Sequence, residues 1–295
     1  MSRKISRKKM SEAITGYLFL SPWLFIFFTF SVFSLGYALY LSFTDYNLLK
    51  PPILWGWEGY KRVFEDDIFL SKALPNTFKY VLVVVPIQTM ISLVLAFAMD
   101  QNLRFRRFFR TVFYLPSVTS SVVISLIFVW LFAPQGIFNQ VTSLTINWLD
   151  EPKYAFYVIM GMNIFTTSGT LMLIFLSGLQ DISPSIYEAA EIDGANPIQI
   201  FFRITIPMLR PVIFFVVTVG VIGCFQVFDQ IFVMTKGGPL DSTTTLTYLI
   251  YKWAFRDTSI KMGQASALAV ILTLIILAVT LLQRRVIEGS GSTTQ

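Results

Sequence analysis

Six long apolar stretches dominate this chain and limit what it can fold into. They cover residues 16–41, 78–99, 112–133, 154–177, 212–234 and 264–283. A bilayer core about 30 Å thick needs about 20 apolar residues in a helix. Because backbone N–H and C=O groups must pair within the segment in lipid, each stretch is predicted to be helical. The predicted fold class is therefore an all-α integral membrane protein with six transmembrane helices.

The composition agrees with a membrane protein and excludes several functions. Of 295 residues, 55% are hydrophobic and only 14% are charged, whereas a soluble domain carries about 25% charged residues. There is no histidine, and Cys224 is the one cysteine. The commonest metal ligand and the commonest general base at neutral pH are therefore missing. We expect no catalytic residue, no metal site and no enzymatic activity in this chain.

Basic residues next to the apolar stretches predict the orientation in the membrane. The runs RKISRKK and RFRRFFR precede the first and third stretches, and cytoplasmic loops carry an excess of Lys and Arg. Segments 1–15, 100–111, 178–211 and 284–295 are therefore expected on the cytosolic side of the plasma membrane. Both termini would be cytosolic, with 1–15 as a retained N-terminal segment and 284–295 as a polar tail. The net charge of +6 follows from this clustering, so we expect membrane lipid and no nucleic acid as a partner.

The loop 178–211 carries start and stop signals for two short helices. Ser183 can cap the first helix, with Pro184 at its first position. Gly194 suits the left-handed residue that ends this helix. Asn196 and Gln199 have the spacing of a capping box at the start of the second helix. The sequence predicts a helical hairpin with a tight glycine turn.

The second helix of this hairpin is predicted to be amphipathic. Phe201, Ile204 and Met208 would share one face, and Pro207 and Pro211 would end the element. Two interpretations remain open from these residues. The hairpin could be a knob that docks into another protein, or an amphipathic element that lies on lipid headgroups.

The same loop resembles a known family. The segment EAAEIDGANPIQIFFRITIPMLRP is similar to the EAA loop of binding-protein-dependent ABC transporter permeases. The matching positions are Glu188, Ala189, Ala190, Asp193, Gly194, Ala195, Ile204 and Pro207. Two further segments, YLFLSPWLFIFF and FDQIFVMTKGGPLDSTTTL, resemble the carbohydrate (maltose and glycerol-phosphate) importer subfamily. The chain lacks the additional N-terminal spans and the large extracellular insertion of the maltose transporter's larger permease subunit.

The resemblance implies an ABC importer permease of the type I fold, with residues 16–283 as the permease domain and 178–211 as its coupling loop. The eight matching positions would sit in a groove of a cytosolic ATPase. The implied partners are a second permease subunit, two ATP-binding subunits and an extracellular solute-binding protein. The chain has no GxxxxGK[ST] phosphate loop, so ATP and Mg would be held by the partner ATPase and this chain would bind no cofactor. The expected function is sugar import. The alternative is a stand-alone secondary transporter or channel. Many secondary transporters contain inverted repeats with broken helices, and we find no clear repeat of this kind in the sequence.

Polar residues inside the fourth and fifth stretches suggest where the solute passes. Such groups are costly in a membrane and are functional hypotheses by default. Asn163, Thr167 and Thr170 recur at i, i+4 and i+7, and Gln226, Asp229 and Gln230 at i, i+3 and i+4. The alternative is interhelical hydrogen bonding, worth about 0.6 kcal/mol on average.

Aromatic residues adjoin these polar positions. Sugars need hydroxyl, amide or carboxylate partners and aromatic faces to cover their apolar ring faces, and Phe165 and Phe225 stand beside the polar residues. The resemblance points to the same places, since several positions match ones that line the sugar site in the maltose permease. The predicted solute pathway is Asn163, Phe165, Thr167, Thr170, Phe225, Gln226 and Asp229.

Overall fold

The computed structural model describes residues 7–101, 104–257 and 259–289. Parts of the predicted terminal segments, residues 1–6 and 290–295, lie outside the described residues. The described chain is mostly helical, and its strands are the two-residue β1 Thr44–Asp45 and β2 Ile53–Leu54, paired antiparallel. The chain divides into two compact units, one of residues up to Val63 plus Trp253–Val270 and one of Phe64–Lys252 plus the residues from Ile271 onward.

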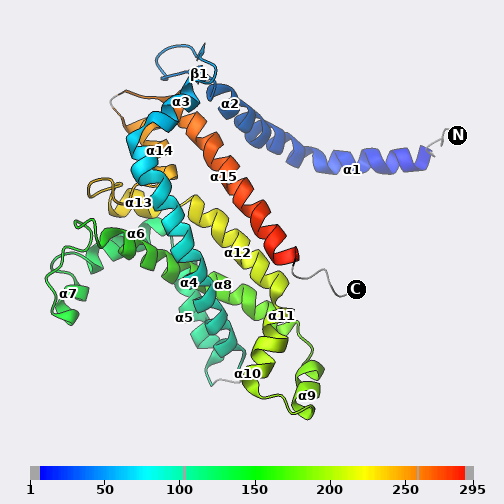
Figure 1. Cartoon of the computed structure of the whole chain (residues 1–295). Coiled ribbons are helices and arrows are strands. Elements are labelled where there is room, and N and C mark those ends of the chain that lie inside the picture. Colours follow the sequence, from blue (N-terminus) through cyan, green and yellow to red (C-terminus); the bar gives the residue numbers. More distant parts are fainter. Residues whose placement is uncertain (1–6, 102–103, 258, 290–295) are drawn as a thin grey trace. The chain divides into compact units, whose positions relative to one another are not determined.

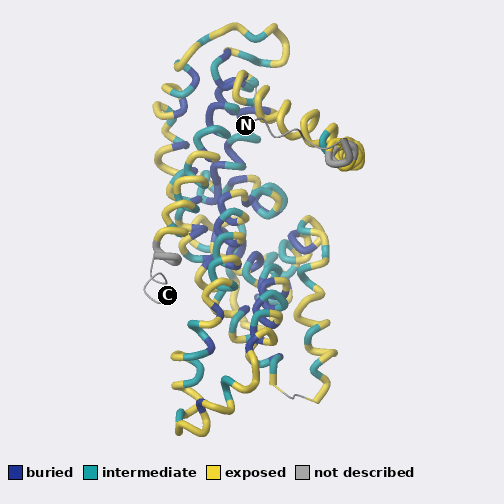
Figure 2. Tube along the Cα trace, turned by 90° about the vertical axis from the view of Figure 1, so that its right-hand side faces the viewer, coloured by how far each residue is buried: buried dark blue, intermediate teal, exposed yellow. Residues whose placement is uncertain are grey.

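The first unit begins with the first apolar span. It is built from α1 Arg7–Ile26, the π-helical segment η1 Phe27–Val32 and α2 Phe33–Leu41. Residues 14–41 are long and apolar enough to cross a membrane, and none of their most apolar window is buried. Figure 2 shows this span as exposed along nearly its whole length. This span covers the predicted stretch 16–41.

The first unit also holds most of α3 Glu58–Glu65, most of the π-helical segment η4 Lys252–Arg256 and the start of α15 Met262–Gly289. Small residues at the start of α15 allow close packing in this unit. The N–H of Gly263 donates to the carbonyl oxygen of Tyr46 at 3.2 Å. A Cβ added to Gly263 would collide with the carbonyl oxygen of Thr44. Ala265 and Ala267, which follow on α15, are fully buried.

The second unit is organised around two long helices that lie side by side, α4 Leu74–Asp100 and α8 Ala155–Gln180 (Figure 1). The π-helical segment η2 Phe69–Ala73 leads into α4. Helix α12 Arg210–Phe225 packs on α4, and α5 Arg106–Val118 packs on α8. The short helices α7 Ile137–Thr142 and α14 Leu246–Tyr251 complete this unit together with the elements described below.

The stretch 112–133 is not the continuous helix that the sequence predicts. Helix α5 ends at Val118, and α6 Ser121–Leu131 leaves it at an angle of 97°. Thr119 between them is extended, with φ −81° and ψ 143°, and its N–H reaches only Pro116, at 3.4 Å. Pro116 cannot donate a backbone hydrogen bond and crowds the preceding turn, so the helix is weakened where it ends.

The stretch 212–234 is also interrupted. Helix α12 ends at Phe225, and α13 Asp229–Met234 starts three residues later. Hydroxyl groups from around α14 bind the carbonyl oxygens at the break: Thr247 donates to Phe225 O at 3.2 Å and Thr245 to Val227 O at 3.3 Å. Such side-chain partners satisfy backbone groups that the helix has released.

Five helical segments in the described residues are long and apolar enough to cross a membrane, and six if the bent pair α5–α6 counts as one span. The predicted stretches 78–99 and 264–283 lie within the segments Phe69–Asp100 and Met262–Arg285. The stretch 154–177 begins one residue before the segment Ala155–Gln180 and otherwise lies within it.

Candidate functional site: a polar cavity and a capped hairpin

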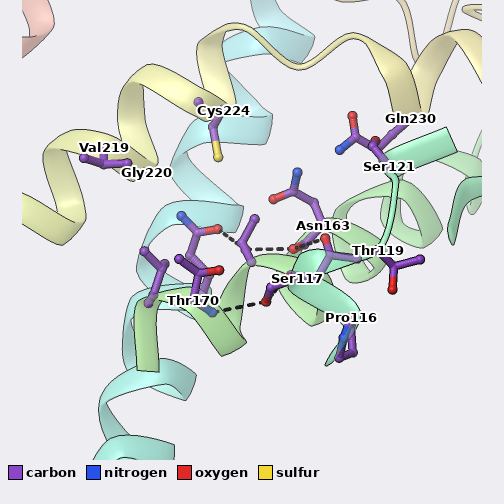
Figure 3. Close-up of a pocket in the computed structure, with 15 residues that line it drawn as sticks. Pro116, Ser117, Thr119, Ser121, Asn163, Thr170, Val219, Gly220, Cys224 and Gln230 are labelled. Carbon is purple, nitrogen blue, oxygen red and sulfur yellow. Dashed lines mark hydrogen bonds between the residues drawn. The ribbon is translucent and has the colours of Figure 1, made fainter. Parts of the chain in front are cut away.

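A cavity of about 410 Å³ opens in the second unit, among α4, α5, α8, α12 and the two helix breaks (Figure 3). Most of its lining side chains are polar but uncharged. The lining residues are Gln88, Pro116, Ser117, Thr119, Ser121, Asn163, Thr166, Thr167, Thr170, Leu171, Val219, Gly220, Gly223, Cys224 and Gln230. We refer to this space as the polar cavity.

Gln88 joins three helices at one wall of the polar cavity. Its side chain is only 2% exposed, and its Oε1 accepts a hydrogen bond from Thr167 Oγ1 at 2.8 Å. On the other side, a Cβ added to Gly220 would lie 2.6 Å from Gln88 Nε2. The amide from α4 is thus held between α8 and a glycine of α12. The sequence analysis missed Gln88, although it is the only amide in the stretch 78–99 and meets the criterion that selected Asn163.

A second close contact joins α5 to α8. Ser117 Oγ donates to Thr166 O and accepts from the N–H of Thr170 at 3.1 Å. A Cβ added to Gly169 would collide with the carbonyl oxygen of Phe113 and lie 2.7 Å from Ser117 Oγ. Because no side chain intervenes at Gly169, α5 can pack directly on α8 beside the cavity.

Two buried polar atoms of lining residues lack a hydrogen-bond partner among the described residues. They are Asn163 Oδ1, on a residue 8% exposed, and Ser121 Oγ at the start of α6. Leaving a buried donor or acceptor unsatisfied costs about 1–3 kcal/mol, and such groups call for an explanation. Both atoms belong to the same cavity, which Figure 3 shows with both residues labelled.

The structure brings together only part of the predicted solute pathway. Asn163, Thr167 and Thr170 line the polar cavity, as one helical face should. Phe165 does not line it: its side chain is 52% exposed and its ring lies 6.1 Å from that of Phe128. Phe225 is fully buried, with its ring edge-to-face at 5.4 Å from Phe78.

The polar residues of the fifth span are separated by the helix break. Gln226 caps the end of α12 and Asp229 begins α13, so their i, i+3 spacing does not place them on one face. Both are exposed and neither lines the polar cavity, whereas Gln230 does. Contact of Phe165, Phe225, Gln226 and Asp229 with solute stays a prediction.

The predicted helical hairpin is present as α9 Pro184–Ile192 and a second helix that starts at Pro197. Ser183 precedes α9 but does not cap it through its side chain; its Oγ pairs with Ser185 Oγ at 2.8 Å. Gly194 has the predicted left-handed backbone, with φ +80°. Its N–H donates to Glu191 O at 3.0 Å, and the N–H of Ala195 donates to Ala190 O at 2.9 Å.

The second helix begins with the predicted capping box. The N–H of Gln199 donates to Asn196 Oδ1 at 2.9 Å, and the N–H of Asn196 donates to Gln199 Oε1 at 3.0 Å. The helix runs as α10 Pro197–Ile200, the π-helical segment η3 Phe201–Thr205 and α11 Ile206–Met208. We call residues 183–209 the capped hairpin.

The second helix ends at Met208, directly after Pro207, and Pro211 lies in the first turn of α12, the next span. One detail of the prediction is wrong, namely the apolar face. The π-helical turn shifts the buried face by one residue along the sequence. Thr205 and Leu209 are therefore buried, and Met208 is exposed. A stripe through Phe201, Ile204 and Met208 presupposes 3.6 residues per turn, which a π-helical segment does not have.

One side of the capped hairpin packs against the transmembrane helices, and the other side is exposed. Ile186 and Tyr187 pack against an apolar cluster that includes Phe175 and Leu179 of α8. Tyr187 Oη also pairs with Thr205 Oγ1 at 3.3 Å, across the hairpin. The cluster thus links the hairpin to the same helix whose middle lines the polar cavity.

The open side of the hairpin combines acidic, small and apolar side chains. Glu188, Ala189, Asp193 and Gly194 are exposed, whereas Ala190 is buried. Three large apolar side chains are also mostly exposed, namely Ile192 (86%), Ile198 (71%) and Phe202 (65%). Ala195, Ile204 and Pro207 are half-buried.

Residues 88–289 match the family model described as "Binding-protein-dependent transport system inner membrane component". The chain belongs to this family. The match covers α4 from Gln88 through the rest of the second unit, including the polar cavity and the capped hairpin.

Relatives of this transport family match over nearly the full chain. The probable ABC transporter permease protein YesP of Bacillus subtilis is 34% identical, over 95% of this chain and 92% of its own. The lactose transport system permease protein LacF of Rhizobium radiobacter is 32% identical, over 92% of this chain and 93% of its own.

The fold of this family member is also found in a solved structure. A bacterial ABC transporter involved in the import of the acidic polysaccharide alginate matches with a TM-score of 0.84 at 21% identity, covering 97% of this chain and 99% of that one. That transporter was also solved in complex with its pentasaccharide-bound periplasmic protein. The predicted ABC importer permease fold is confirmed. The chain is a multi-pass membrane component of a transport system and not an enzyme.

Proposed function

We propose that this chain is the permease subunit of an ABC importer that moves a sugar, an oligosaccharide or a sugar derivative across the plasma membrane. ATP hydrolysis on a partner subunit drives the transport. The observation that carries the proposal is that α8 bears both the wall of the polar cavity and the cluster that anchors the capped hairpin. A movement imposed on the hairpin can thereby reach the cavity through one rigid helix. The lactose relative and the alginate transporter support a carbohydrate as the solute.

The capped hairpin is the proposed contact with the ATPase. The exposed side chains of Ile192, Ile198 and Phe202 supply apolar contact area, and Ala189 allows a close approach. A partner that pushes on this surface acts on Tyr187 and so on α8. ATP and Mg are bound by that partner. The coupling positions are Glu188, Ala189, Ala190, Asp193, Gly194, Ala195, Ile204 and Pro207.

The proposed assembly contains a second permease subunit, two ATP-binding subunits and an extracellular solute-binding protein. The alginate transporter's complex with a periplasmic protein supports the last of these. The basic residues of segments 1–15 and 100–111 support an orientation with both termini in the cytosol. In this orientation the capped hairpin faces the ATPase.

Photo-crosslinking tests the docking surface. A photoreactive phenylalanine analogue replaces Ile192 in the assembled transporter, and a control carries it at Leu240, which is equally exposed (83%) outside the hairpin. The adduct at position 192 is expected to contain the ATP-binding subunit, and the adduct at position 240 is not. Adducts of position 192 with lipid alone would contradict docking and support a hairpin that lies on headgroups.

A further inference from the structure

Two arginines at the start of α5 turn toward the ends of the neighbouring helices. Arg106 and Arg110 are spaced i, i+4, which places them on one face of the helix. Both are half-buried, whereas Arg107 between them is exposed. The basic run that contains them predicts membrane orientation, and orientation requires positive charge but no particular helix face. The inward face of these two residues therefore needs another explanation.

The two guanidinium groups join the ends of three helices. Arg110 Nη2 donates to the carbonyl oxygen of Met99 at 3.3 Å, and Arg106 Nη2 lies 3.9 Å from Asp100 Oδ1. Met99 and Asp100 belong to the last turn of α4, where carbonyl groups have no partner within the helix. The amide of Gln180, the last residue of α8, is oriented by its partners so that Oε1 accepts from Arg106 Nη2 at 2.7 Å and from Arg110 Nη2 at 3.2 Å. We call Asp100, Arg106, Arg110 and Gln180 the arginine clamp.

The arginine clamp lies at the base of the capped hairpin. Helix α8 ends at Gln180 and α9 begins at Pro184, so only three residues separate the clamp from the first helix of the hairpin. Ile182, in this connection, is 6% exposed and belongs to the apolar cluster against which Ile186 and Tyr187 pack. The connection is therefore short and held in place, and a displacement of the hairpin reaches Gln180 directly.

The other end of α5 contributes to the polar cavity. Pro116 and Ser117 line it, and Ser117 is hydrogen-bonded to the backbone of α8 at Thr166 and Thr170. Helix α5 is thus tied to α8 twice, once at Ser117 and once through the clamp. Eleven residues, about 16 Å of helix, separate Ser117 from Arg106. Two ties this far apart prevent α5 from pivoting about Ser117 when α8 moves.

Gln180 is the member of the clamp that can be altered with the least damage to the fold. Its oxygen is the acceptor that both guanidinium groups share, and it is the one clamp residue on α8. Gln180 is exposed, so water competes for its hydrogen bonds. Arg106 and Arg110 keep their partners on α4 when the amide is lost. Removing the amide should therefore release the start of α5 from α8 without unfolding the protein.

We propose that Gln180 is a positioning residue for transport, which acts through Arg106 and Arg110 to make α5 move together with α8 when the ATPase displaces the capped hairpin. The walls of the polar cavity on these two helices then move as one body. The inference rests on the proposed function and deepens it, because it assigns part of the coupling between ATP hydrolysis and solute movement to the clamp. Without the clamp the hairpin still moves, but α5 lags behind, and some ATP is hydrolysed without transport.

The number of ATP molecules hydrolysed per sugar molecule taken up tests this role. It is measured with radiolabelled lactose and maltose in proteoliposomes that contain the complete transporter, with the binding protein outside. Gln180→Leu should raise this ratio about threefold or more. Gln180→Glu keeps an acceptor for both guanidinium groups and should retain the ratio of the unaltered protein. The control Gln140→Leu removes an exposed amide of α7 that donates to Gln135 O at 2.8 Å outside the clamp, and it should also leave the ratio unchanged.

The outcomes of this assay separate the inference from the proposed function. An unchanged ratio in Gln180→Leu would overturn the inference and leave sugar import standing. Absence of ATP-driven uptake of either sugar by the unaltered transporter would count against the proposed function instead.

Spin-label distances test the movement itself. In a Cys224→Ser background, labels are attached at Phe108→Cys on α5 and Ser185→Cys on α9, two exposed positions. With the clamp intact, the distance between the labels should be the same without nucleotide and with ATP bound to the ATPase. In Gln180→Leu the distance should change when ATP binds. A change of equal size with the clamp intact would contradict a joint movement of α5 and α8, and a constant distance in both proteins would show that the clamp is not needed for it.

Discussion

Gly220→Ala tests the contact between α12 and the buried amide of α4. The added Cβ would lie 2.6 Å from Gln88 Nε2, so the amide must move by about 0.8 Å to reach an ordinary contact of 3.4 Å. Gln88 is 2% exposed and has its Oε1 tied to Thr167 at 2.8 Å. The shift therefore disrupts a buried hydrogen bond, and overpacking of this kind costs about 1–3 kcal/mol. We expect a loss of about 2 kcal/mol in the free energy of unfolding, measured in mixed detergent micelles.

A double-mutant cycle identifies the cause of that loss. Gln88→Ala removes the amide that the new methyl group would strike. In this background Gly220→Ala should be neutral, or stabilising by up to about 1 kcal/mol because alanine favours the helix. The coupling energy between the two positions should therefore be at least about 2 kcal/mol. An equal loss from Gly220→Ala in both backgrounds would refute the proposed contact.

Three further changes have expected outcomes that unfolding and uptake assays can check. Gly169→Ala should destabilise the protein by more than about 1 kcal/mol, because its Cβ collides with α5, while Gly161→Ala on the same helix meets open space and should not destabilise it; equal effects would contradict the packing of α5 on α8. Gly194→Ala should lower the free energy of unfolding by only about 1 kcal/mol, because alanine must adopt a positive φ. Gly194→Pro cannot adopt that φ and loses the hydrogen bond to Glu191 O, so it should abolish uptake while the protein still inserts into the membrane. Normal uptake by the proline variant would argue against coupling through the hairpin. Asn196→Ala removes the capping box and should cost about 1 kcal/mol, and no loss would show that the cap contributes little.

The apolar spans and the hairpin could be predicted from the sequence because their signals are local. Span length follows from bilayer thickness, and the four predicted stretches without a break coincide with continuous helical segments. The capping box at Asn196 and the left-handed Gly194 are set by neighbouring residues. These elements needed no knowledge of what packs against them.

The break after α12 depends on distant partners and could not be predicted, whereas the break at Thr119 follows Pro116, which is a local signal. The end of α12 at Phe225 is stabilised by hydroxyl groups of Thr245 and Thr247, some 20 residues later in the chain. This break separates Gln226 from Asp229 and Gln230, and of these three predicted residues Gln230 is the one that lines the cavity. The break at Thr119 likewise placed Ser121 in the wall. The periodicity of polar residues could thus locate the part of the cavity wall on α8. The parts contributed by the other helices could not be predicted in this way.

ATP-driven uptake of a sugar into proteoliposomes tests the central claim most directly. The vesicles contain this permease with its partner permease and ATP-binding subunits, and the binding protein is added outside. We predict that lactose or another sugar accumulates inside against its gradient only when ATP, the ATP-binding subunits and the binding protein are all present. Uptake at the same rate by this chain alone, without ATP or partners, would contradict the account and indicate a stand-alone transporter or channel.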